Sequence, residues 1–354
     1  MTDKLKALLD TRQLLLADGA TGTNLFAAGL QTGDAPELWN TERSDRITDL
    51  HRSFVNAGSD IILTNSFGGT HYRLALHKAG HRVAELNQSA ARLARAEADA
   101  VDRTVLVAGS MGPTGEILQP NGSVSIDEAR RAFAEQAEAL AEGGVDILWI
   151  ETISSAEEIE AAVLGAATIG LPIVYTVSID TNGRTMMGLT PAETLKISTS
   201  LNTPIAAVGS NCGVGASEVV AAICNLQAAT KNLGVNPALV AKANCGIPDY
   251  VDGKIVYSGT PELMAQYAIL AANAGASIIG GCCGTTPEHV SAMREAIDQW
   301  QPGSPSPDVD TITRVLGELS QGAKAQMAGD LSVAGGSASG RGSRVTRRRR
   351  RGPD

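Results

Sequence analysis

The chain has 354 residues, enough for one large domain or two ordinary ones. Hydrophobic residues make up 43% and charged residues 19%, a composition typical of a globular protein with a sizeable core. No apolar run reaches the roughly 20 residues that a membrane helix needs, and the N-terminal residues lack the pattern of a secretory signal. We therefore expect a cytoplasmic protein that does not act at a membrane.

The charge is divided unevenly along the chain. The formal net charge is −9, but the last fourteen residues hold seven Arg and one Asp, so that the rest carries about −15. An acidic body of this kind excludes a nucleic-acid surface on the folded part. The basic C-terminal end, with five consecutive Arg at 347–351, is predicted to be a solvated, disordered tail.

Short apolar runs rich in β-branched residues alternate with Ala-rich segments of helical period. This alternation is typical of βα units around a parallel sheet. The helix starts are marked by capping residues: Ser125 and Glu128 form a capping-box pair, and Thr190, Thr260 and Thr286 each precede a proline. The predicted strands are Leu14–Asp18, Asp60–Asn65, Val105–Ser110, Asp146–Glu151, Ile173–Ile179, Ile205–Asn211, Leu239–Asn244 and Ser277–Gly281.

Eight such units favour a single α/β domain, a closed (β/α)8 TIM-type barrel over residues 1–303, rather than an open doubly wound sheet. Residues 304–354 are predicted to form a tail with one further helix at 310–319 and disorder from about residue 329, where Gly, Ser and Arg predominate. Nearly every predicted strand ends in a polar or glycine-rich motif. In a barrel these ends share one rim, where active sites of the fold lie.

Five cysteines in a chain without a secretory signal predict reduced thiols rather than disulfides. Cys282 and Cys283 lie within Gly-Gly-Cys-Cys-Gly, where the glycines permit a turn that directs both sulfurs inward. Cys212 ends the sixth strand, one strand away from this pair. Three thiolates and an open fourth position are typical of a catalytic Zn²⁺ site, so we predict that these three cysteines bind zinc. Cys224 and Cys245 are interpreted as packing residues.

Such a metal would bind a substrate thiol, lower its pKa and hold it as a nucleophilic thiolate. Two other classes of function remain open at this point. One is a phosphate-binding barrel enzyme without zinc, whose glycine-rich last loop holds a phosphate; the other is a zinc-bound scaffold without activity. Adjacent cysteines are a poor phosphate cradle, and an open ligand position has no use in a scaffold, so both are less favoured.

Five strand-end motifs are similar to those of a known family. They are Asp-Gly-Ala-Thr-Gly-Thr at 18–23, Thr-Asn-Ser-Phe at 64–67, Glu-Thr at 151–152, Asn-Cys-Gly at 211–213 and Gly-Gly-Cys-Cys-Gly at 280–284. From about Leu14 to Val290 the chain resembles the homocysteine-binding methyltransferases. These include the homocysteine module of cobalamin-dependent methionine synthase, betaine–homocysteine methyltransferase and S-methylmethionine-dependent enzymes.

The resemblance implies a (β/α)8 barrel, zinc on Cys212, Cys282 and Cys283, and attack of the metal-held homocysteine thiolate on a donor methyl group to form methionine. It also implies that Asp18 and Glu151 hold the ammonium group of homocysteine. The turn that follows Asp18 would offer backbone N–H groups to the substrate carboxylate, and the second strand end supplies one more candidate. These further substrate-binding candidates are Gly19, Ala20, Thr21 and Asn65.

The methyl donor is predicted from what the rim lacks. Betaine-type relatives carry a tyrosine after the strand-two Phe and another after the strand-four Glu, and a quaternary ammonium favours an aromatic cage. Here Gly68 and Thr152 occupy those places, and aromatic residues make up only 3% of the chain. Trp39 is the remaining candidate on the donor side. We therefore expect a methyl-corrinoid protein as donor and docking partner, with betaine or another onium compound as the alternative.

Overall fold

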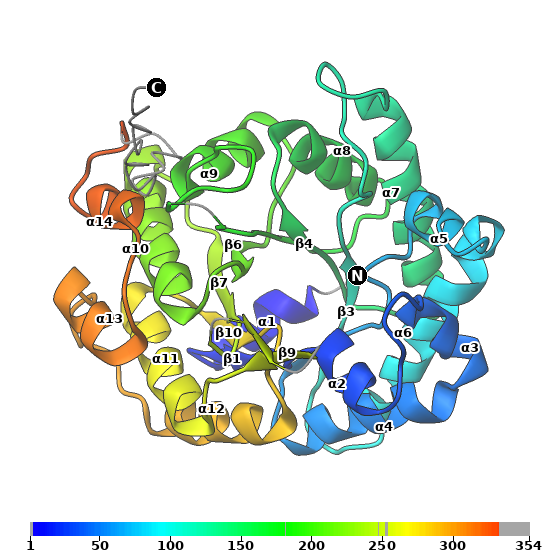
Figure 1. Ribbon diagram of the computed structural model, residues 1–354, viewed down its shortest axis with the longest axis horizontal. Helices are drawn as coiled ribbons and strands as arrows, with labels where there is room; N and C mark the ends of the chain where they lie inside the picture. The colour runs from blue at the N-terminus through cyan, green and yellow to red at the C-terminus, as the bar shows by residue number, and fades with distance from the viewer. Residues whose placement is uncertain (1–2, 181, 247, 252–253, 333–354) are drawn as a thin grey trace, which may run out of the picture.

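The fold is that of a computed structural model, which describes residues 3–180, 182–246, 248–251 and 254–332, without the side chains of 247–256. Eight parallel strands form one sheet in the order β1-β10-β7-β6-β5-β4-β3-β2. The two edges of this sheet meet where Ala17 pairs with Ile61 in a parallel bridge. The predicted (β/α)8 barrel is therefore confirmed, and Figure 1 shows the helices arranged as a ring around the strands.

The strands overlap the predicted runs, and most bounds differ by one or two residues. β1 and β2 are shorter than expected because the chain leaves the ladder soon after the bridge that joins the two edges of the sheet. The strands of the barrel are β1 (Leu15–Leu16), β2 (Ile61–Leu63), β3 (Leu106–Met111), β4 (Ile147–Ile153), β5 (Ile173–Val177), β6 (Ala207–Cys212), β7 (Ala238–Ala243) and β10 (Ile278–Gly281).

The helices begin at the predicted capping residues. Ser125 and Glu128 form a reciprocal capping box, and Thr190 forms another with Glu193. The helices are α1 (Lys4–Thr11), α2 (Gly22–Ala27), α3 (Trp39–Glu42), α4 (Ser44–Asn56), α5 (His71–Ala75), α6 (Val83–Asp99), α7 (Ile126–Gly143), α8 (Ala156–Ala167), α9 (Pro191–Ser200), α10 (Ala216–Leu233), α11 (Pro261–Ala274), α12 (Pro287–Gln299), α13 (Val309–Leu316) and α14 (Gln321–Met327), with 3-10 turns at Pro36–Leu38 and Gly80–Arg82.

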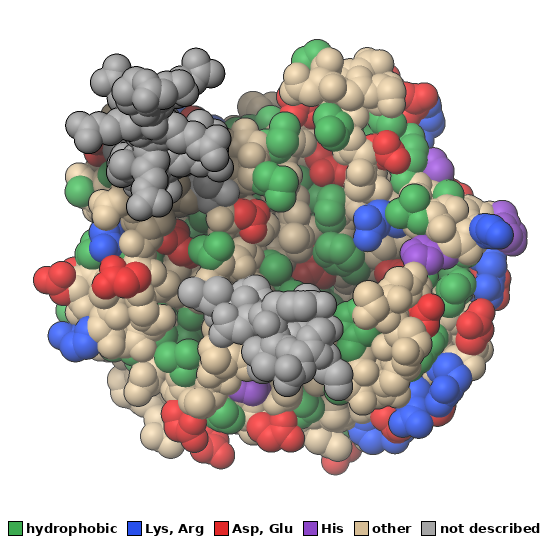
Figure 2. Space-filling model, viewed as in Figure 1, with side chains coloured by type: hydrophobic (Ala, Val, Ile, Leu, Met, Phe, Trp, Pro, Cys, Tyr) green, Lys and Arg blue, Asp and Glu red, His purple; other side chains and the backbone are tan. Residues whose placement is uncertain are grey.

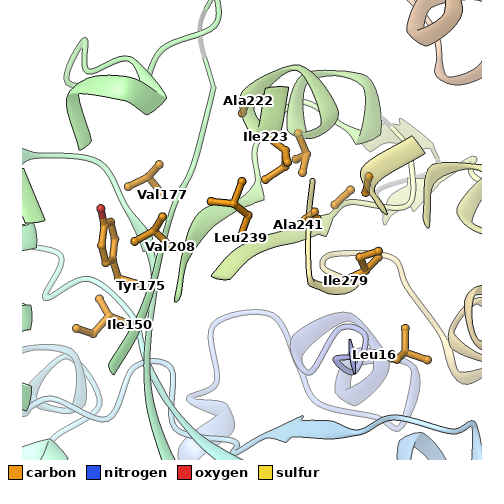
Figure 3. Close-up of a cluster of buried hydrophobic side chains, with 14 of the residues drawn as sticks. Leu16, Ile150, Tyr175, Val177, Val208, Ala222, Ile223, Leu239, Ala241 and Ile279 are labelled. Atoms are coloured by element: carbon orange, nitrogen blue, oxygen red, sulfur yellow. The ribbon is translucent and has the colours of Figure 1, made fainter. Parts of the chain in front are cut away.

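The strands bury apolar side chains on both faces, as parallel strands covered by helices do. Figure 3 shows part of the outer layer, which includes Tyr175, Val208 and Leu239 of the strands and, beside Leu239, Ile223 of α10. The inner layer fills the barrel, and Leu5 and Leu8 of α1 belong to the same cluster. Helix α1 therefore closes the amino-terminal end of the barrel.

The interior becomes polar toward the carboxyl ends of the strands. Side chains on one face of a strand recur at every second residue, and the inward positions that follow the apolar layer carry polar groups. On β4, Trp149 is followed by Glu151, and on β7, Val240 is followed by Lys242. A polar layer thus lies on top of an apolar one. The residues of this layer are Ser110, Glu151, Thr176, Asn211 and Lys242.

Two features lie outside the predicted pattern of strands and helices. An antiparallel hairpin of β8 (Pro248–Val251) and β9 (Lys254–Tyr257) separates β7 from α11. In the segment predicted to be a tail, Ile312 of α13 and Ala323 of α14 are buried in the main core. The predicted disorder concerns mainly 333–354, which lie outside the described residues. Across the described ranges, no helix is both long and apolar enough to cross a membrane.

Candidate metal centre and substrate pocket

Three cysteine sulfurs meet at the carboxyl-end rim of the barrel. The Sγ atoms of Cys212, Cys282 and Cys283 all lie within 4.8 Å of one another, and those of Cys212 and Cys283 are 3.9 Å apart. Among the described residues, no other group of three His, Cys, Asp or Glu side chains brings its ligand atoms this close together. The structure therefore unites the three cysteines singled out in the sequence, which are separated by about 70 residues.

The backbone at both cysteine motifs is turned sharply. Cys212 has φ of 60° and Gly213 has φ of 65°, so the chain leaves β6 through two consecutive left-handed residues. After β10, the N–H of Thr285 donates to the carbonyl of Cys282 at 3.0 Å and closes a turn in which Gly284 has φ of 80°. This turn is what allows two adjacent cysteines to direct their sulfurs to one point.

Asn244 connects the two cysteine turns. Its Oδ1 accepts a hydrogen bond from the N–H of Cys283 at 3.0 Å, and its Nδ2 donates to the carbonyl of Gly213 at 2.8 Å. Since Asn244 is 2% exposed, both bonds are shielded from water. The distance between Cys212 and Cys283 is thus held by one buried side chain that belongs to neither motif.

Asn211 makes a second connection, across β4, β5 and β6. Its Oδ1 accepts from the N–H of Thr152 at 2.9 Å and from the hydroxyl of Thr176 at 2.7 Å, while its Nδ2 donates to the Thr152 hydroxyl at 2.8 Å. Thr152 has φ of 65°, a rare value for a β-branched residue, and the pairing of β4 with β5 shifts between Ile150 and Ile153. The irregular end of β4 is therefore fixed by Asn211.

The cysteines form a crowded, largely buried cluster, which disfavours thiolates. The hydrogen bond with Cys282 lowers the pKa of Cys212. The bond with Cys283 and burial outweigh this effect, and the pKa of Cys212 is raised overall, to about 12. The bond with Cys212 lowers the pKa of Cys283, whereas the bond with Cys282 and burial bring it to about 12. The pKa of Cys282 is raised as well. A nearby cation is what would convert such thiols into ligands at neutral pH.

The carboxylates at the ends of β1 and β4 are both buried, and the first of them pairs with a buried cation. Asp18 accepts from Lys242 Nζ at 2.8 Å and from the N–H of Leu63 at 2.7 Å, and Glu151 accepts from the Ser110 hydroxyl at 2.5 Å. Burial raises the pKa of both carboxyl groups; the ammonium of Lys242 offsets part of this rise, and both pKa values stay above the usual range. Burial also lowers the pKa of Lys242, but Asp18 and Glu151 outweigh it and raise this pKa overall.

Lys242 and Asn244 were missed by sequence analysis. A signal was available for the lysine, because a charged residue inside the buried run Leu-Val-Ala-Lys-Ala at 239–243 requires a partner of opposite charge. The identity of that partner could not be predicted from the sequence, since Asp18 lies 224 residues away. Asn244 follows the same strand and resembles any turn residue in sequence.

The turn after Asp18 is packed tightly against the β10 turn. A Cβ on Gly19 would lie 2.7 Å from the carbonyl of Thr285, and the N–H of Ala20 donates to that same carbonyl at 3.1 Å. Thr21 precedes α2 and accepts from the N–H of Leu25 at 3.0 Å. The turn is thus held beside the cysteines, with the N–H of Ala20 already engaged by the protein.

The two other candidate residues lie in different surroundings. Asn65 donates through Nδ2 to the carbonyl of Pro36 at 2.8 Å and to Oδ1 of Asn40 at 2.9 Å, so its amide braces the loop after β2. Trp39 lies on α3, with the Arg43 guanidinium 5.5 Å from its ring centroid, and lines a cavity of about 330 Å³ that contains none of the three clustered cysteines. The structure does not bring these two side chains to the cysteine cluster.

Comparisons with known proteins agree with this geometry. The profile of the family described as Homocysteine S-methyltransferase matches residues 15–297. The chain is 31% identical over 313 residues to methionine synthase of Mycobacterium tuberculosis, covering 84% of this chain and 25% of that protein. It is 29% identical to the Mycobacterium leprae methionine synthase, covering 86% of this chain and 26% of that protein. The chain thus spans about a quarter of the length of these relatives.

Solved structures show the same similarity over nearly the whole length of the matched protein. The homocysteine methyltransferase MmuM from Escherichia coli, in its metallated form, superposes with a TM-score of 0.67 at 26% identity, covering 82% of this chain and 99% of MmuM. Its apo form superposes with a TM-score of 0.64, also at 26% identity, with the same coverage of both chains.

Proposed function

Because the chain belongs to the homocysteine S-methyltransferase family, we propose that it transfers a methyl group to the thiol of homocysteine and forms methionine. The observation that carries this proposal is the convergence of three cysteine sulfurs beside two buried carboxylates at one barrel rim. A sulfur ligand set suits a thiol substrate, and the carboxylates suit its ammonium group.

Five free cysteines, three of them in this cluster, also suit a reducing compartment, so we propose a cytoplasmic location for the protein.

Cys212, Cys282 and Cys283 fit Zn²⁺ as the resident metal. Zinc–sulfur bonds of about 2.3 Å in a tetrahedron put sulfurs about 3.8 Å apart, close to the 3.9 Å between Cys212 and Cys283. Three thiolates are soft ligands, which select zinc over magnesium or calcium, and they leave a fourth position for substrate. When bound, the metal supplies a Lewis acid that lowers the pKa of the substrate thiol.

The remaining groups of the pocket bind and orient the amino-acid part of homocysteine. We assign its ammonium to the carboxylates of Asp18 and Glu151, both buried at the same rim. We assign its carboxylate to the backbone of Gly19 and Thr21, since the N–H of Ala20 is occupied by Thr285. With both ends of the substrate fixed, its sulfur is held at the cysteines and open toward the barrel mouth, from which the donor approaches.

For the methyl donor we propose a methyl-corrinoid protein. Large apolar side chains are exposed in the loops that follow β2, β3, β5 and β6, and Figure 2 shows hydrophobic side chains around this face. An open apolar rim suits a large partner, and the similarity to methionine synthases favours the same donor class. The exposed side chains are Phe67, Ile117, Met186, Met187 and Val214.

Metal analysis tests the cysteine assignment. We expect about one zinc per chain in the protein, and loss of most of it in Cys212→Ala and in Cys283→Ala. Cys224→Ala is the matched control, because Cys224 lies on α10 and bonds to Ser306 and Pro307, away from the cluster. Full zinc retention in both cluster variants would reject these residues as ligands.

A donor assay separates the two candidate donors. Zinc-loaded protein is incubated with homocysteine and either methylcobalamin or betaine, and methionine is measured by mass spectrometry. We expect methionine with methylcobalamin and little with betaine. Rapid turnover with betaine would overturn the corrinoid donor while supporting homocysteine as acceptor, and absence of methionine with both would count against the proposed reaction.

A further inference from the structure

A lysine is buried inside the barrel at the level of the proposed substrate pocket. Lys242 on β7 is 2% exposed, its Nζ lies 2.8 Å from Asp18 Oδ1, and it is 5.8 Å from the centroid of the Trp149 ring. Burying an ammonium is costly unless it is paired. A residue of this kind, in the layer that faces the substrate, therefore calls for a reason beyond packing.

The groups around Lys242 show an excess of negative charge. The pKa of Lys242 is raised by Asp18 after β1, by Glu151 on β4 and, more weakly, by Cys282 after β10. The ring of Trp149 covers the ammonium from the apolar layer. Two buried carboxylates near each other tend to share a proton, because both cannot carry a charge without compensation. The ammonium of Lys242, which pairs with Asp18 and favours the charged form of Glu151, offsets this repulsion, and the three groups together carry one net negative charge.

We propose that Lys242 is a positioning residue that keeps Asp18 and Glu151 ionised together, so that the pocket selects thiols carrying an α-ammonium group. The proposal rests on the proposed function, because it takes homocysteine as the ligand of this pocket. Lys242 acts through the carboxylates and does not itself contact the ammonium. The substrate ammonium then completes a neutral set of two cations and two carboxylates.

Replacing the ammonium by an apolar side chain of similar length changes this balance. In Lys242→Met, Asp18 and Glu151 share one proton near neutral pH. Homocysteine then binds only by displacing that proton, whereas a thiol without an amino group is unaffected. The expected loss is specific to the ammonium and recovers as the pH rises, since the proton is then released more easily.

The experiment measures binding rather than turnover. Isothermal titration of zinc-loaded protein gives the affinities for homocysteine and for 4-mercaptobutyrate, its analogue without the amino group, between pH 6.5 and 8.5. Both ligands release a thiol proton on binding, so the ratio of the two affinities removes this common contribution to the pH dependence. We expect this ratio to fall roughly 10- to 100-fold in Lys242→Met at pH 7, the range for one lost interaction with a charged group, and to recover partly at pH 8.5.

The matched control is the double variant Asp18→Asn with Lys242→Met, which leaves Glu151 as a lone carboxylate. We expect its affinity ratio to be independent of pH over this range. An unchanged ratio in Lys242→Met, or an equal loss of affinity for both thiols, would overturn the role of Lys242. If the unmodified protein binds neither thiol, the proposed function fails instead.

Discussion

The buried amide of Asn244 offers a direct test of how the metal centre is positioned. It holds the two cysteine turns through bonds of 2.8 and 3.0 Å to Gly213 and Cys283. At about 1 kcal/mol net for each bond, Asn244→Ala should weaken zinc binding by about 2 kcal/mol, or roughly 30-fold in Kd. This agrees with the 10- to 100-fold effects typical of residues that orient metal ligands. Competition with a chromophoric chelator at fixed pH measures the change.

Asn225→Ala is the matched control for this prediction. Asn225 is also a buried asparagine, 7% exposed, and its Oδ1 accepts from the N–H of Ala192 at 3.1 Å, between α10 and α9. Its loss should lower the urea midpoint of unfolding without changing the zinc Kd. The reasoning is refuted by a zinc Kd in Asn244→Ala within two-fold of the unmodified protein, or by an equal weakening in Asn225→Ala.

Two further predictions concern stability. Burial lowers the pKa of His51 from 6.5 to about 4, so the folded state keeps the ring neutral; its contribution is complete above pH 6.5 and is lost as the pH falls toward 4, by about 3 kcal/mol. Urea unfolding between pH 4 and 7 should show this slope, and His51→Leu should lack most of it. Gly209→Ala places a Cβ 1.9 Å from the carbonyl of Val240 and should cost about 3 kcal/mol or more, whereas Gly22→Ala, with open space around it, should have little effect on the unfolding midpoint.

The barrel could be predicted because its signals are local. Each strand is a short apolar run, and helix starts such as Ser125 and Thr190 carry their caps within three residues. Repetition of these signals eight times left few alternatives to a barrel. The β8–β9 hairpin was missed although Asp252-Gly253 is a pair typical of tight hairpin turns, because a βα repeat was expected to continue there.

The cysteine cluster could be predicted for a different reason. Glycines around Cys282 and Cys283 indicated a turn, and the fold brings the end of β6 to within one strand of β10. The partners of Lys242 could not be predicted in this way. Its pairing with Asp18 depends on the inward direction of β7 and on the bend of the chain after β1, and neither has a local signature.

Backbone strain marks the same rim independently of the motifs. Thr152 and Cys212 both have φ near 60°, a conformation that costs these residues energy. Asn211 is adjacent to Cys212 and bonds to both the N–H and the hydroxyl of Thr152, so one side chain connects the two strained points. Strain persists only where surrounding bonds enforce it. Here the strain coincides with the ends of β4 and β6, the strands that supply Glu151 and Cys212. The strained backbone therefore lies where the residues proposed to bind the ammonium and the thiol of the substrate must be fixed relative to each other.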